Sequence, residues 1–135
     1  MKYFISGHRD LSYEDFEKYY IPKIKDIVQK DNEAKFIVGD CNGVDKYAMD
    51  YIFCETMSSV VIYHMFVKPR NTPKDKHPGD LVSDYKGVSF KGGFKSDEER
   101  DSAMTNDSDF DIAFVKDNRW NSGTAQNIKR RHGIV

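Results

Sequence analysis

Three polar segments of this 135-residue chain directly follow short apolar runs and carry residues that could bind an anionic ligand. The first is Ser6-Gly7-His8-Arg9-Asp10. Glycine lets a ligand approach the backbone, and the Arg9 guanidinium can form a bidentate, charge-assisted pair with a phosphate. The alternative is a simple turn in which Arg9 pairs with Asp10. We favour a ligand-binding role, which Gly7 and His8 would share.

The second segment is Gly39-Asp40-Cys41-Asn42-Gly43-Val44-Asp45, at the junction of a strand-like and a helix-like run. Its glycines leave backbone N–H groups free at a helix N-terminus, where an anion is stabilised. Asp45 could accept a hydrogen bond from a ribose hydroxyl, or could simply be favoured by the helix dipole. Cys41 is expected to be a small filler, because no histidine lies near it in sequence. The expected ligand-binding residues here are Gly39, Asp40, Gly43 and Asp45.

The third segment spans residues 117–124 and ends in Ser122-Gly123-Thr124 at the start of the last expected helix. Free backbone N–H groups and two hydroxyls at a helix start suit a phosphate or a ribose. The alternative interpretation is a well-capped helix with no ligand.

Apolar strand runs alternate with capped helical patterns, which predicts one Rossmann-like α/β domain with a mainly parallel sheet of four or five strands between two helical layers. We expect a central strand at Lys2–Ser6, and Pro22 should bend or split the first helix. With the four expected strands in the order 3-2-1-4, the first and third segments share a crevice at the carboxyl edge of the sheet, where such folds bind ligands. The expected strands are Lys2–Ser6, Lys35–Val38, 60–67 and 111–115, and the expected helices are 12–29, Val44–Glu55, 96–105 and 122–131.

Residues 68–95 interrupt this alternation with three of the four prolines and four of the nine glycines. A connection this long inside one domain is usually a functional lid or a disordered insertion. We expect an irregular lid over the crevice. The alternative is a mobile connection with one irregular strand near residues 88–90.

The bulk composition sets limits on partners and location. A net charge of −1 gives no general attraction for nucleic acid, so a nucleic-acid partner is disfavoured. No apolar run could span a bilayer, and the chain enters a strand-like run at once, so we expect neither a membrane segment nor a signal peptide. Two cysteines without a CxxC motif fit free thiols in the cytoplasm. We expect no metal and no cofactor, and homo-oligomerisation is left open.

Together the three segments resemble the SLOG superfamily over nearly the whole chain except residues 68–95. This group includes the lysine-decarboxylase-like (LOG) phosphoribohydrolases, the DprA/Smf DNA-processing proteins and a small branch akin to YspA and YpsA. Nucleoside 2-deoxyribosyltransferases are more distantly similar. The resemblance implies a Rossmann-like domain that binds a nucleotide-type ligand. It places the phosphate or ribose at Gly7, Arg9, Gly43, Asp45, Gly123 and Thr124.

The chain departs from these enzymes at one position. They usually carry a Gly-Thr-x-x-Glu pattern whose glutamate acts on the N-glycosidic bond, whereas Asn127 stands at the corresponding place here. An amide cannot act as a carboxylate base or nucleophile. Asn127 therefore favours a binding protein that senses or sequesters a nucleotide, nucleoside or ADP-ribose-like small molecule. The alternative is an N-ribosyl hydrolase or transferase using Glu98, Glu99 or Asp45, although Glu98 and Glu99 also fit a solvated helical turn.

Overall fold

Five parallel strands form one sheet in the order β4-β3-β2-β1-β5. The computed structural model describes residues 1–73, 87–116, 119 and 122–132. Each strand pairs in parallel register with its neighbour, as in Phe4 opposite Ile37 and Asp111. The strands are β1 (Lys2–Ser6), β2 (Lys35–Val38), β3 (Ser59–Met65), β4 (Val88–Phe94) and β5 (Phe110–Ala113).

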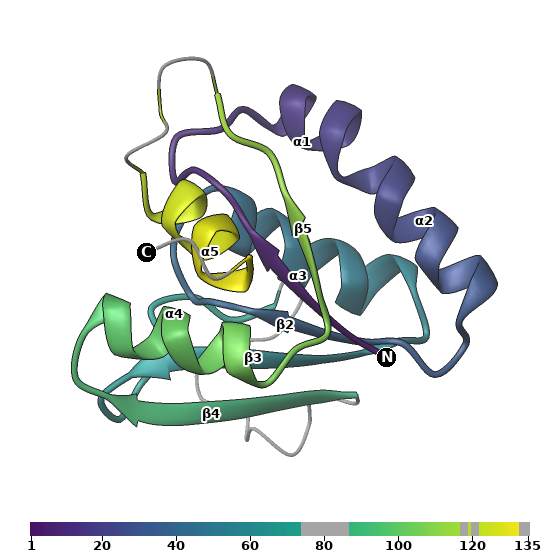
Figure 1. The fold of residues 1–135 in the computed structure, drawn as a ribbon. Helices are drawn as coiled ribbons and strands as arrows, with labels where there is room; N and C mark the ends of the chain where they lie inside the picture. The colour runs from purple at the N-terminus through teal and green to yellow at the C-terminus, as the bar shows by residue number, and fades with distance from the viewer. Residues whose placement is uncertain (74–86, 117–118, 120–121, 133–135) are drawn as a thin grey trace.

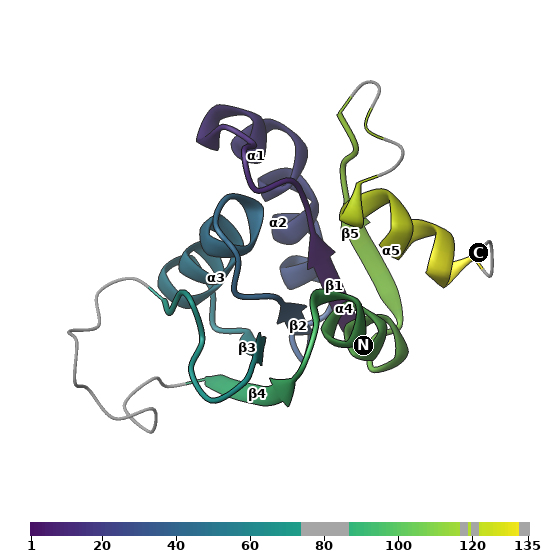
Figure 2. The ribbon, with the colours of Figure 1, turned by 90° about the vertical axis from the view of Figure 1, so that its left-hand side faces the viewer.

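Helices cover both faces of the sheet (Figures 1 and 2). The first three helices lie on one face and the last two on the other. Strands buried on both sides have to be apolar along their whole length, which accounts for runs such as Phe4-Ile5 and Phe36-Ile37-Val38. The helices are α1 (Tyr13–Tyr19), α2 (Ile21–Lys30), α3 (Val44–Glu55), α4 (Asp97–Asn106) and α5 (Gly123–Arg131).

The expected α/β fold class is confirmed, with β1 in the interior of the sheet between β2 and β5. Two strand ranges differ from expectation. The strand expected at 60–67 ends at Met65, because Phe66 has a φ of 52°, which takes the chain out of the extended conformation. The strand expected at 111–115 covers Phe110–Ala113, since only these residues pair with β1.

Pro22 splits the first helix as expected. The helix is interrupted at Tyr20, which lies between α1 and α2, and Pro22 lies in the first turn of α2. A proline lacks the backbone N–H that a helix interior needs, but the first turn has no intrahelical acceptor for that group. Ser12 caps α1 by accepting a hydrogen bond from the Asp15 backbone N–H at 3.1 Å.

The segment 68–95 differs from expectation in one part, since Val88–Phe94 forms the regular edge strand β4, paired in parallel with β3. Residues 74–86, within the expected lid, lie outside the described residues. Gly92 lowers the strand propensity of this segment. It is needed because the His64 ring of β3 lies against it and leaves no room for a side chain.

Gly92→Ala is therefore expected to lower the free energy of unfolding by about 1–3 kcal/mol, because the new methyl group overlaps the buried His64 ring. Urea denaturation followed by circular dichroism measures this change. Gly123→Ala is the control, because a Cβ at Gly123 meets no atom within 4 Å. Equal stability of the two variants would contradict the packing of β4 on β3.

Candidate functional site

A cavity of about 450 Å³ lies at the carboxyl edge of the sheet, over the ends of β1 and β2 and beside α4 and α5. Both the segment after β1 and the start of α5 line it, as the expected strand order requires. The lining residues are Phe4, Ser6, Gly7, His8, Arg9, Asp10, Cys41, Asp45, Asp97, Arg100, Asp101, Met104, Arg119, Ser122, Gly123, Thr124 and Asn127.

Most of the residues singled out in the sequence meet at this cavity. They come from the segment after β1, from the first turn of α3 and from the first turns of α5. The members of this group are Gly7, His8, Arg9, Asp45, Ser122, Gly123, Thr124 and Asn127. The other candidates do not line the cavity: Gly39, Asp40, Gly43, Glu98 and Glu99.

The Tyr20 hydroxyl holds the ends of β1 and β5 together beneath the cavity. It donates a hydrogen bond to the Ser6 carbonyl oxygen at 2.8 Å and accepts one from the Phe114 backbone N–H at 3.0 Å. Tyr20 is fully buried, and burial raises the pKa of its phenol, so the hydroxyl stays protonated and keeps both roles. The two loops that form the cavity thus start from strand ends fixed by one side chain.

Gly43 packs the second loop against the first. Its φ of 75° favours glycine, and a Cβ there would collide with the backbone carbonyl of Arg9. The next residue, Val44, donates its backbone N–H to the His8 carbonyl oxygen at 3.3 Å. The Gly43 position therefore supports the cavity from behind and does not contact its interior.

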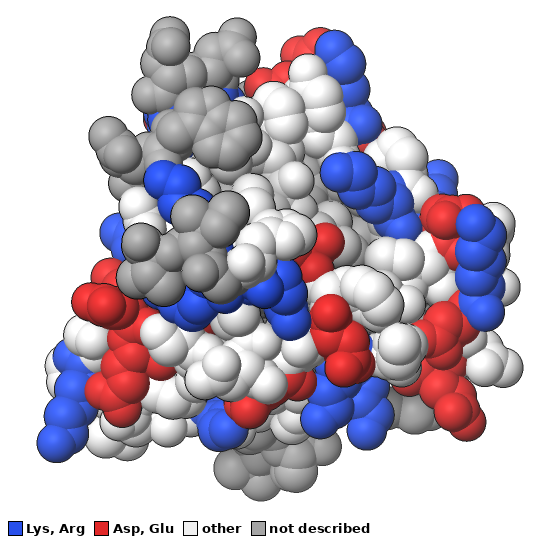
Figure 3. Space-filling model, viewed as in Figure 1, with Lys and Arg blue, Asp and Glu red and all other residues white. Residues whose placement is uncertain are grey.

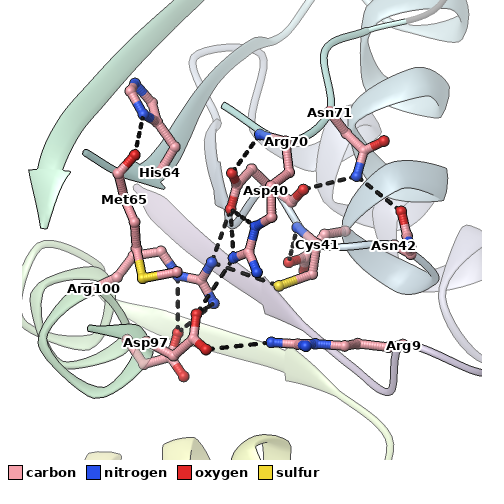
Figure 4. Close-up of polar contacts among 12 residues, drawn as sticks. Arg9, Asp40, Cys41, Asn42, His64, Met65, Arg70, Asn71, Asp97 and Arg100 are labelled. Atoms are coloured by element: carbon pink, nitrogen blue, oxygen red, sulfur yellow. Dashed lines mark hydrogen bonds and ion pairs between the residues drawn. The ribbon is translucent and has the colours of Figure 1, made fainter. Parts of the chain in front are cut away.

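The carboxylate of Asp40 is bound by two arginines of the protein itself. Arg70 donates to its carboxylate through the backbone N–H at 2.7 Å and the guanidinium at 2.9 Å, and Arg100 donates at 2.8 Å (Figure 4). Burial opposes ionisation of Asp40, but these hydrogen bonds and positive charges outweigh it and hold its pKa below the ordinary value. Asp40 is therefore an ionised anchor for two arginines.

Arg100 forms the buried wall of the cavity on the α4 side. Besides Asp40, its guanidinium donates to the Asp101 carboxylate at 3.1 Å and to the Cys41 sulfur at 3.5 Å. Its side chain is only 5% exposed, so these partners replace water almost completely. Burial raises the pKa of the Cys41 thiol, which fits the expected role of a filler and leaves it a poor nucleophile at neutral pH.

Asp45 is a buried carboxylic acid at the cavity. Burial raises its pKa to about 7; the nearby Asp101 and Asp40 charges act in the same direction, while Arg100 and the Cys41 N–H act against them. The Cys41 backbone N–H donates to Oδ2 at 3.1 Å. At neutral pH, Asp45 can therefore take up or release a proton within the cavity.

Two ion pairs cross the mouth of the cavity. Arg119 binds Asp10 in a bidentate pair at 2.7 and 2.8 Å, and Arg9 contacts Asp97 at 3.4 Å. The alternative in which Arg9 pairs with Asp10 is thus wrong, because Arg119 occupies that carboxylate. The Arg9 side chain is 61% exposed, and an exposed pair of this kind stabilises by only about 0–1 kcal/mol, so a ligand anion can replace it cheaply.

Helix periodicity separates Glu98 and Glu99 from the cavity. The α4 residues that line it follow the spacing i, i+3, i+4, i+7, which marks one face of the helix: Asp97, Arg100, Asp101 and Met104. Glu98 and Glu99 lie off that face, and a Glu99 oxygen accepts the Lys95 backbone N–H at 3.2 Å. They fit the solvated first turn. The same spacing was available in the sequence and could have indicated Asp101.

Comparison of the chain with family models, with characterised proteins and with solved structures finds no match. Within the part of the chain that the structure describes, no group of three His, Cys, Asp or Glu side chains is placed to hold a metal ion. In the same residues, no helix has both the length and the apolar character needed to cross a membrane.

Asp45→Asn is expected to flatten the pH dependence of stability. Because burial raises the pKa of Asp45 from 3.8 to about 7, the folded protein keeps a proton that the unfolded chain releases. The contribution of this group to the free energy of unfolding is full below pH 3.8 and is lost as the pH rises towards 7. Urea titrations across this range should show a smaller loss in Asp45→Asn than in the unmodified protein.

The control for this experiment is Asp26→Asn, which removes an exposed carboxylate of α2 paired with Lys30. It should reproduce the pH dependence of the unmodified protein. An Asp45→Asn variant with that same pH dependence would show that Asp45 titrates as an ordinary carboxylate.

Proposed function

We propose that this cavity binds a nucleotide, nucleoside or ADP-ribose-like small molecule, and that the protein senses or sequesters this ligand. The observation that carries the proposal is the convergence of Arg9, Arg119 and the α5 N-terminus on one cavity that also holds the buried Asp45 carboxyl group. A volume of about 450 Å³ lies in the lower half of the usual range for ligand pockets, roughly 300–1,000 Å³.

The mouth of the cavity suits a phosphate. Ser122 caps α5 through its side chain, and the following backbone N–H groups of Gly123 and Thr124 belong to the helix start, which has no intrahelical acceptors for them. An anion at such an N-terminus is stabilised by these donors and by the helix dipole. Arg9, whose exposed pair with Asp97 an anion can replace, adds a positive charge that can pair with a phosphate in bidentate fashion. Arg119, paired with Asp10, lines the same cavity.

The charge distribution favours a small molecule over a nucleic-acid polymer. On the face shown in Figure 3, acidic and basic side chains are interspersed, without a wide basic area. A nucleic-acid surface usually gathers lysine and arginine on one face, so that many phosphates can be bound at once.

Arg9→Ala is expected to weaken the binding of a 5′-phosphorylated nucleoside roughly ten- to a hundredfold, because it removes a charge-assisted contact of about 1.5–3 kcal/mol. Isothermal titration calorimetry of the adenosine, guanosine, cytidine and uridine monophosphates measures this loss. Lys30→Ala is the control, since it removes a positive charge on α2, away from the cavity. Unchanged affinity in Arg9→Ala would contradict the assignment of Arg9 to the phosphate.

An N-ribosyl hydrolase or transferase is the second candidate, and the placement of Asp45 and Asp101 at the cavity favours it. Two carboxyl groups can serve as general acid and as the group that stabilises a developing sugar cation. Asn127 also lines the cavity, at the position of the glutamate in the Gly-Thr-x-x-Glu pattern of the similar enzymes. Its amide cannot act as a base or as a nucleophile.

We expect the protein to bind its ligand without releasing free base from nucleosides, nucleoside monophosphates or NAD-related compounds. Chromatographic detection of free base is the measurement. Rapid release that is lost in Asp45→Asn or Asp101→Asn, but kept in Glu98→Gln and Glu99→Gln, would establish the enzyme instead. The glutamine variants are matched controls, because both glutamates lie outside the cavity.

A further inference from the structure

Four polar side chains of the cavity are each held by the protein at one atom only. They are His8, Asn127, Asp45 and Asp101, and within the described chain the second polar atom of each has no protein partner. Ser6 adds a buried hydroxyl, which likewise finds no partner among the described residues. Polar groups in such positions are nearly always hydrogen-bonded in proteins, so this set is available to bind the polar groups of a ligand that enters the cavity.

The held atom of His8 determines its tautomer. The Lys116 backbone N–H donates to Nε2 at 2.9 Å, and a backbone N–H can only donate, so Nε2 must carry a lone pair. The neutral ring therefore bears its proton on Nδ1. Burial and the positive charges of Arg119 and Lys116 lower the pKa of His8, which keeps the ring neutral. His8 thus offers one N–H donor of fixed orientation.

Asn127 is oriented in the same way. Arg130 donates its guanidinium N–H to Oδ1 at 2.7 Å, so the amide group Nδ2 is left as the free end. Asn127 is only 4% exposed, and the surface it keeps lies at the cavity. The α5 wall therefore offers a second neutral donor.

The two carboxyl groups supply the acceptors. Arg100 holds Asp101 at Oδ1, and the Cys41 N–H holds Asp45 at Oδ2. The other oxygen of each is available to a ligand. Neutral donors and carboxyl acceptors thus line the same small cavity, inside the arginines at its mouth.

A hydroxyl is the neutral group that satisfies both kinds of partner, since it donates to a carboxylate and accepts from an N–H. A phosphate here would face the carboxyl groups of Asp45 and Asp101, and an apolar group would leave the donors unsatisfied. We infer that His8, Asn127, Asp45 and Asp101 form a sugar subsite that binds the vicinal hydroxyls of a ribose and selects it over 2-deoxyribose. This inference rests on the proposed function and specifies its ligand class.

Pairs of ligands that differ by one hydroxyl test this subsite. The pairs are the four nucleoside 5′-monophosphates with their 2′-deoxy counterparts, and ribose 5-phosphate with 2-deoxyribose 5-phosphate. Isothermal titration calorimetry should show at least about tenfold tighter binding of the ribose member. The 2-deoxy member lacks one hydroxyl and so leaves polar groups of the subsite unpaired. Equal affinities within the pairs would overturn the inference.

Two substitutions of His8 distinguish the roles of its two ring nitrogens. His8→Gln can still accept the Lys116 N–H but loses the donor at the Nδ1 position, so the preference for ribose should fall about tenfold. His8→Asn keeps a donor near the Nδ1 position and should retain more of the preference than His8→Gln. His132→Gln, an exposed histidine outside the cavity, is the control and should keep the full preference.

A measurement without any ligand or variant tests the same geometry. Two-dimensional ¹H–¹⁵N NMR of the histidine ring should show His8 as the neutral tautomer protonated on Nδ1. A neutral ring protonated on Nε2 would overturn the donor assignment.

The outcomes separate this inference from the proposed function. If ribose 5-phosphate binds with the expected preference and no nucleotide binds better, the sugar subsite stands and the nucleotide proposal fails. If nucleotides bind and their 2′-deoxy forms bind equally well, the nucleotide proposal stands and the sugar subsite fails. If neither these compounds nor ADP-ribose binds, both are overturned.

Discussion

The cavity depends on one buried guanidinium. Arg100 lies between the carboxylates of Asp40 and Asp101, and so ties α4 to the loop after β2 across 60 residues of sequence. A charge this deeply buried is tolerated only because its partners replace water, and removal of one partner typically costs about 3–5 kcal/mol. The contact with Asp101 also orients a carboxyl group that lines the cavity. Stability and the geometry of the site are therefore inseparable at Arg100.

The charges around Arg100 also determine what the cavity can hold. Asp40 and Asp101 already balance Arg100 and Arg70, so a further ionised carboxylate at Asp45 is disfavoured by burial and by its neighbours. The interior is thus close to neutral and rich in hydrogen-bonding groups. The Arg9 guanidinium, whose exposed ion pair with Asp97 a ligand anion can replace, lies at the mouth. This gradient suits a ligand with a polar, uncharged body and an anionic end.

The sheet order brings the parts of this site together. Because β1 lies between β2 and β5, the loops that follow these strands open on one edge, and the Tyr20 hydroxyl joins two of the strand ends. Two residues of the second loop contribute from behind the cavity: Gly43 packs under the backbone of Arg9, and Asp40 anchors arginines. A loop rich in glycine and acidic residues can thus serve a site by supporting it.

Local patterns in the sequence determined most of the secondary structure and part of the site. The ranges Lys2–Ser6, Lys35–Val38 and Val44–Glu55 agree with the structure, because apolar periodicity, caps and prolines act over a few residues. Arg9 and the first turns of α5 were placed at the cavity because the carboxyl ends of neighbouring parallel strands share an edge.

Only the tertiary structure decided which polar groups are paired and which are buried. Asp40, the long-range carboxylate partner of Arg100, lies 60 residues away in sequence. Apart from helical spacing, nothing local distinguishes Asp101, which lines the cavity, from Glu98, which does not. The tautomer of His8 follows from a backbone N–H 108 residues distant. Pairing, tautomer and pKa depend on neighbours that long-range packing supplies, and a single sequence does not contain those distances.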